Sequence, residues 1–164
     1  MVFGLLVILV ISMVAFRWYG FFEGAGIRQP LEFSHKVHTE MVQCEECHTG
    51  VKKSAFAGMP GIKICTGCHG DTPVTESPEE KKLINYVKAG QEIRWRRLYQ
   101  NPFHVYFSHA RHVSVGNVEC EKCHGPIGKA SKPPRRALVA IDMSDCISCH
   151  KEKKVDISCV VCHK

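Results

Sequence analysis

The chain has 164 residues, of which 45% are hydrophobic, with ten cysteines, ten histidines and a formal net charge of +6. This length has room for one small domain or two very small ones, whose apolar core is too small to stabilise the fold alone. Disulfides, zinc, iron–sulfur clusters or covalent haem are the candidate stabilisers. The sequence shows no nucleophile triad, phosphate-binding loop or paired-carboxylate site, so no catalytic residue is predicted.

The N-terminal segment is strongly apolar. Residues 2–16 carry no charge, and Arg17 ends the run. A cluster of aromatic residues follows: Trp18, Tyr19, Phe21 and Phe22. Aromatic side chains are typical of a membrane interface and extend an apolar run that is slightly short for a span of about 20 residues. We expect a retained transmembrane helix over residues 1–22. A signal peptide cleaved at residues 24–26 is the alternative, but no basic residue precedes the run.

Every cysteine belongs to a C-x-x-C pair that is followed at once by histidine. The cysteines are Cys44/Cys47, Cys65/Cys68, Cys120/Cys123, Cys146/Cys149 and Cys159/Cys162, and the histidines are His48, His69, His124, His150 and His163. This spacing is specific to haem attachment, in which two thioethers fix the porphyrin and the adjacent histidine ligates iron. Zinc, disulfides and iron–sulfur clusters do not need a histidine directly after each second cysteine. The sequence therefore predicts five covalently bound haem c groups.

An internal repeat organises the chain. The segment Phe33-Ser34-His35-Lys36-Val37-His38 is echoed by Phe107-Ser108-His109-Ala110-Arg111-His112, and each copy is followed within a few residues by one C-x-x-C-H motif and then by another. A repeat of this kind indicates a repeated structural unit. We predict an anchor over 1–22, a di-haem unit over 23–76, a helical connector over 77–103, and a second di-haem unit with the fifth haem over 104–164. The fold class expected is mainly α with extensive loops.

The connector contains one clear helix. Ser77-Pro78-Glu79-Glu80 has the pattern of a capping box with proline at the first helical position. Leu83, Ile84 and Val87 form an apolar face, and Gly90 is a natural C-terminal stop. We interpret this helix as a structural spacer.

Five histidines remain after the proximal ligands are assigned: His35, His38, His104, His109 and His112. The count matches the number of haems and favours bis-histidine ligation throughout. Residues at i and i+3 share one side of a helical turn, so each repeated pair can reach two haems. Methionines are the competing sixth ligands: Met41, Met59 and Met143. Iron held by two protein ligands has no open position, which suits electron transfer rather than catalysis.

The net charge does not indicate a nucleic-acid partner. Each ferric haem contributes about +1 from its iron–porphyrin core and about −2 from its propionates, so five haems change the total by about −5. Three arginines lie around Trp95: Arg94, Arg96 and Arg97. We interpret them as propionate partners or a docking surface, with an idle solvated run as the alternative.

Several segments carry a resemblance to a known family. They are the two F-S-H-x-x-H segments, Cys47-His48-Thr49-Gly50-Val51, Ser77-Pro78-Glu79, Gly90-Gln91-Glu92-Ile93-Arg94-Trp95 and Val105-Tyr106-Phe107-Ser108-His109. With them the chain resembles class III multihaem cytochromes c, and more specifically the pentahaem membrane-anchored subunit of alternative complex III. The resemblance implies a compact class III-like domain on the periplasmic face of the cytoplasmic membrane. It also implies partner subunits in a quinol-oxidising complex and a periplasmic electron-acceptor protein.

Two other functions stay open at this point. One is a freestanding membrane quinol dehydrogenase with its own quinone pocket near the anchor. The other is a reductase of a small nitrogen or sulfur species at one five-coordinate haem. Related quinone reductase complexes use similar subunits, so the direction of electron flow is also open.

Overall fold

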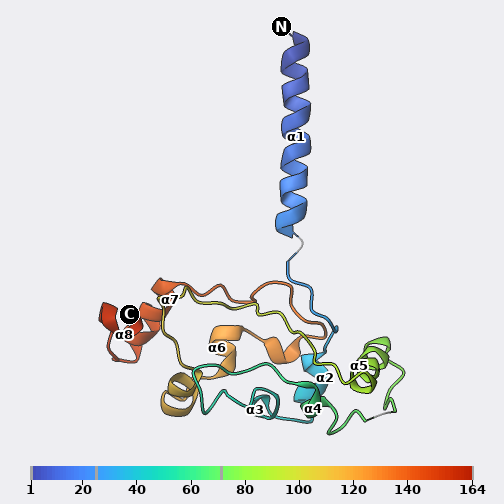
Figure 1. Ribbon diagram of the computed structural model, residues 1–164. Helices are drawn as coiled ribbons and strands as arrows, with labels where there is room; N and C mark the ends of the chain where they lie inside the picture. Colours follow the sequence, from blue (N-terminus) through green and yellow to red (C-terminus); the bar gives the residue numbers. More distant parts are fainter. Residues whose placement is uncertain (1, 25, 71, 164) are drawn as a thin grey trace.

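The computed structural model describes residues 2–24, 26–70 and 72–163 (Figure 1). One long helix, α1 (Val2–Gly24), projects away from the rest of the chain, which consists of short helices joined by long loops. The other helices are α2 (His35–Thr39), α3 (Cys44–Cys47), α4 (Ile62–Cys65), α5 (Pro78–Lys88), η1 (Arg111–Val115), α6 (Cys120–His124), η2 (Ile127–Lys129), α7 (Met143–Glu152) and α8 (Cys159–Cys162). Within these ranges the extended backbone pairs at one isolated antiparallel bridge, between Val105 and His163. The predicted mainly helical, loop-rich class is confirmed.

The structure does not support the predicted membrane span. Across residues 2–24, 26–70 and 72–163, no helix has the combination of length and apolar character required to cross a membrane. The expectation of a transmembrane anchor over residues 1–22 is therefore not supported. Met1 lies outside the described residues, and of the predicted aromatic cluster only Trp18 has a described side chain, which is exposed.

The C-x-x-C-H motifs fold as single helical turns. Helices α3, α6 and α8 each begin at the first cysteine of a motif, α7 contains a motif, and α4 ends at one. The histidine amide donates to the carbonyl of the first cysteine in the turns of His48 (2.8 Å), His69 (2.8 Å) and His163 (2.9 Å). An i to i+4 bond of this kind closes one helical turn and holds both cysteines and the histidine close together.

Helix α5 begins and ends where its sequence predicts. The Ser77 side chain accepts from the Glu79 amide at 3.3 Å, Pro78 is the first helical residue, and Gly90 follows the helix with φ of +61°. The predicted capping box is wrong in one respect. The Ser77 amide donates to the Thr75 hydroxyl at 3.2 Å, and Glu80, which was expected to accept this bond, points elsewhere.

The apolar core is very small. Leu31, Leu83 and Ile93 form its buried cluster, with Ile62, Cys65, Tyr86 and Trp95 packed against it. The Trp95 indole donates to the Pro60 carbonyl at 2.9 Å and ties the segment after α5 to the loop before α4. Among the described residues, no large side chain is less than 2% exposed. This cluster therefore supports one end of the domain, beside the second C-x-x-C-H motif.

The Leu83→Ala variant tests this cluster. Leu83 is 8% exposed, and we expect its truncation to lower the free energy of unfolding by about 2–3 kcal/mol, the lower part of the range for buried leucines, because a small cluster can partly collapse. Denaturant unfolding of the haem-loaded protein, followed by circular dichroism, measures the change. Asn85→Ala, an exposed position on the same helix, is the control and should change stability by less than about 0.5 kcal/mol. Equal losses in the two variants would contradict the assignment.

Candidate metal centres

The ten histidines lie as five pairs, each joining a motif histidine to one of the remaining five. Ring centroids are 6.1 Å apart for His38 and His69, 6.3 Å for His109 and His124, 6.1 Å for His112 and His150, and 5.4 Å for His104 and His163. We assign His35 and His48 as the fifth pair, because the charge of His48 lowers the pKa of His35 more than the charge of His38 does. The structure thus brings together every histidine that the sequence predicts as a ligand.

These separations fit a metal ion held between two imidazoles. A metal–imidazole bond of about 2.0–2.1 Å, followed by about 1.1 Å from the nitrogen to the ring centre, places the two centroids about 6.3 Å apart. Three of the four measured pairs lie within 0.2 Å of this value. The His104–His163 pair, at 5.4 Å and nearly parallel, is closer than that separation.

Half of the paired imidazoles are oriented by backbone carbonyls. The Nδ1 atoms of five histidines contact a carbonyl oxygen: His38 with Ser34 (2.8 Å), His48 with Gly58 (2.7 Å), His109 with Ala55 (2.9 Å), His112 with Ser108 (2.8 Å) and His150 with Asp156 (2.9 Å). A carbonyl can only accept, so each Nδ1 carries the proton. The Nε2 lone pair is then free to bind a metal, which is the usual arrangement of a ligating histidine.

The sequence repeat is also a geometric repeat. Phe33 stacks on the ring of His38 with centroids 4.2 Å apart and meets His35 edge-on at 5.0 Å. In the second copy, Phe107 stacks on His112 at 4.3 Å and meets His109 edge-on at 4.9 Å. The two F-S-H-x-x-H segments therefore set their histidines in the same way, and the phenylalanine in each holds both rings.

Burial lowers the pKa of two imidazoles. Burial, together with the charges of His48 and His38, lowers the pKa of His35. Burial and the charges of His109 and His48 likewise lower the pKa of His124. The Nδ1 atom of His35 is buried and has no hydrogen-bond partner in the described part of the chain. A buried nitrogen without a partner is uncommon and is a sign of a bound group.

The cysteines connect the five motifs into one row. All ten are free thiols, so both sulfurs of each pair are available for thioether bonds. Burial raises the pKa of five of them, and charged neighbours from other motifs contribute: Cys68 acts on Cys47, Cys47 on Cys65, Cys44 on Cys120, Cys149 on Cys123, and Cys162 on Cys146. These interactions agree with a row in which the motifs follow in the order second, first, third, fourth, fifth. Figure 1 shows the same progression, from α4 and α3 through α6 to α7 and α8.

The arginines near Trp95 do not act as one group. Arg94 and Arg96 line an open cavity of about 840 Å³ together with Gly26, Arg28, Gln29 and Pro30. The guanidinium of Arg97 instead lies over the Phe56 ring, 5.8 Å from its centre. The cavity, with three arginines, suits an anionic group, as the propionate-partner interpretation requires.

One contact was missed by sequence reasoning. Oε1 of Glu80 lies 2.6 Å from Nδ1 of His69. Hydrogen bonds from the Thr75 hydroxyl and the Val74 amide outweigh burial and, with the His69 contact, lower the pKa of Glu80 to about 2. The capping-box pattern concealed this role, because it accounts for the same glutamate by a local contact.

Comparison with known proteins identifies relatives. Residues 31–83 and 105–164 match the family described as cytochrome c7 and related cytochrome c. The chain is also 31% identical, over 183 aligned residues, to a protein of Nitratidesulfovibrio vulgaris named "Menaquinone reductase, multiheme cytochrome c subunit". The alignment covers 95% of this chain and 87% of that protein.

Proposed function

Because the chain belongs to the family of cytochrome c7 and related cytochromes c, we propose that it is the electron-relay subunit of a quinone-linked oxidoreductase complex. Family membership makes it a multihaem c-type cytochrome with covalently bound haem c. The observation that carries the proposal is the row of five histidine pairs, each at a C-x-x-C-H motif and each next to another.

We propose five haem sites, each attached by thioether bonds to the two cysteines of one C-x-x-C-H motif. Each haem would be held by two histidines, as the pairs His48 with His35, His69 with His38, His124 with His109, His150 with His112, and His163 with His104. Bound haem supplies reversible one-electron chemistry at iron. The chain supplies two imidazoles at each site and thereby closes the iron to outside ligands. The fold of the chain also fixes the order of the haem sites. Electrons would therefore pass along the row between the end near α5 and the end near α8, in either direction.

The partners and location are part of the same proposal. We place the chain at the periplasmic face of the cytoplasmic membrane, beside other subunits of the complex and a periplasmic acceptor protein. Two observations support the partner subunits. The Nitratidesulfovibrio relative is named as a subunit of a reductase, and α1 exposes apolar side chains from Val7 to Phe16 that a neighbouring subunit would cover.

Two directions of electron flow are consistent with this role. Resemblance to the pentahaem subunit of alternative complex III supports quinol oxidation, with electrons leaving to a periplasmic acceptor. The name of the Nitratidesulfovibrio relative supports the opposite direction, from a periplasmic donor to menaquinone. The histidine pairs serve both directions equally.

Purification of the tagged chain in mild detergent tests the proposal. We expect larger subunits to accompany it, and the haems of the purified complex to exchange electrons with the quinone pool. Reduction of the haems by added quinol, followed in the visible spectrum, would favour quinol oxidation. Oxidation of pre-reduced haems by added menaquinone analogue would favour quinone reduction. A chain that purifies alone and exchanges with neither would contradict the proposal.

A further inference from the structure

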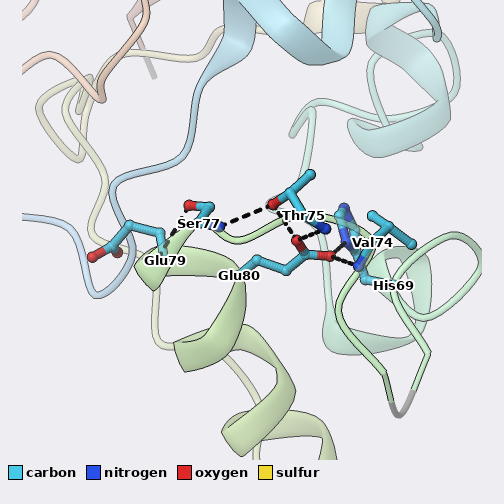
Figure 2. Close-up of polar contacts among 6 residues, drawn as sticks. All are labelled: His69, Val74, Thr75, Ser77, Glu79 and Glu80. Carbon is cyan, nitrogen blue, oxygen red and sulfur yellow. Dashed lines mark hydrogen bonds and ion pairs between the residues drawn. The ribbon is translucent and has the colours of Figure 1, made fainter.

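The Glu80 carboxylate contacts a histidine of the second C-x-x-C-H motif. Its Oε1 atom lies 2.6 Å from Nδ1 of His69 and also accepts from the Val74 amide at 2.8 Å. Its Oε2 atom accepts from the Thr75 amide at 2.7 Å and from the Thr75 hydroxyl. Figure 2 shows the glutamate turning from the first turn of α5 toward these groups, while Glu79 points away from them.

This contact differs in charge from those of the other histidines. Among the described residues, His38, His48, His109, His112 and His150 meet neutral backbone carbonyls, and His69 alone meets a carboxylate. Glu80 is 6% exposed, so water does little to screen its charge. Three donors besides His69 hold it in place, and its direction is thus set by the loop of residues 72–77 as well as by the helix.

A carboxylate acceptor changes what an imidazole does to a metal. It draws the Nδ1 proton toward itself, and the ring becomes a stronger electron donor through Nε2. Negative charge near iron also stabilises the ferric form relative to the ferrous form. A neutral carbonyl does both to a smaller extent.

We propose that Glu80 is a tuning residue that lowers the reduction potential of the haem attached at Cys65 and Cys68. This haem would be at one end of the row, because Figure 1 shows α4 beyond α3, on the side away from α6. Glu80 therefore biases one end of the row toward the oxidised state. The inference requires haem at this motif, which family membership supports, and it does not depend on the quinone-linked role.

The competing explanation is that Glu80 only shapes the loop of residues 72–77. Both explanations predict some loss of stability when Glu80 is replaced. Only the tuning role predicts a change in one reduction step at full haem content. The neighbouring Glu79 offers a matched control, because it accepts from the Glu32 amide and from Lys82, and among the described residues no hydrogen bond joins it to a histidine.

The experiment compares Glu80→Gln with Glu79→Gln in the haem-loaded full-length protein. Pyridine haemochrome quantitation first establishes that both variants carry the wild-type number of haems. Potentiometric titration of Glu80→Gln should then show one reduction step moved to higher potential, and its ferric electron paramagnetic resonance spectrum should show one low-spin signal moved. Glu79→Gln should match the wild type in both. Unchanged steps in Glu80→Gln, or the same shift in both variants, would overturn the proposal.

A second variant keeps the test decisive if Glu80→Gln loses haem. Thr75→Val removes the hydroxyl donor but leaves the carboxylate on His69, so more of the negative charge acts on the imidazole. The same reduction step should then move to lower potential, opposite to the shift in Glu80→Gln. An upward shift, or none, would show that the carboxylate does not act on the iron.

Discussion

In the His104→Ala variant, we expect every haem to stay attached while one iron becomes five-coordinate and binds carbon monoxide. Thioether attachment does not depend on the second axial ligand, so the haem remains. The iron loses one of its two imidazoles, and an open position appears. Titration of the dithionite-reduced variant should show about one equivalent of carbon monoxide per chain, against nearly none in the wild type.

His104 is the histidine best suited to this substitution, because it lies outside the sequence repeat. Its ring stacks on His163 at 5.4 Å, and the bridge between Val105 and His163, with the Tyr106 amide donating to the Cys162 carbonyl at 2.8 Å, holds the two segments together. A neighbouring residue provides the control. Phe103→Ala removes an exposed ring whose centroid lies 5.3 Å from His104, and it should bind no carbon monoxide.

Two results would contradict this prediction. Carbon monoxide binding by the unaltered protein would show an iron that is already open, as a small-molecule reductase needs. Failure of His104→Ala to bind would show that another side chain ligates this iron, and the candidate methionines are Met41, Met59 and Met143.

The second large effect is expected when haem attachment is prevented altogether. In a chain with all ten cysteines replaced by alanine, residues 26–163 should lose their tertiary structure. The buried hydrophobic residues of the described chain are Leu31, Val51, Leu83, Ile84 and Ile93. Five such side chains, at about 1.5–3 kcal/mol each, do not offset the conformational entropy of ordering well over a hundred residues.

Limited proteolysis and thermal melting measure this loss. We expect the cysteine-free chain to be cleaved in residues 26–163 at least about tenfold faster than the haem-loaded protein and to melt without a cooperative transition. Helical signal from α1 is compatible with this outcome, because α1 stands apart from the haem-bearing part. A protease-resistant fragment with a sharp transition would show that the polypeptide folds on its own.

The sequence predicted the parts that depend on local pattern. The C-x-x-C-H turns, the repeated F-S-H-x-x-H geometry and the limits of α5 follow from spacing, since their contacts span a few residues. The role of the ten histidines as metal ligands stays a prediction. Which histidine faces which did not follow from spacing, because His104 and His163 are brought together by a bridge between distant segments.

Non-local contacts account for the differences. Glu80 has a helix-capping position in the sequence, yet the loop after His69 returns to it and supplies stronger partners than the Ser77 amide. The carbonyls of Ala55 and Gly58 that orient His109 and His48 carry no sequence signal, because every residue has a carbonyl. The second repeat also differs from the first by a π-helical turn, Arg111–Val115, closed by the Gly116 amide on the Arg111 carbonyl at 2.9 Å.

The spatial order of the motifs has a consequence for damage to the chain. In the proposed arrangement of five haems, the haem at Cys44/Cys47 would lie inside the row, although its motif comes first in the sequence, and the haem at Cys65/Cys68 would lie at one end. Loss of the haem at Cys65/Cys68 would remove one end of the row and leave four haems in series. Loss of the haem at Cys44/Cys47 would instead separate the haem at Cys65/Cys68 from the other three.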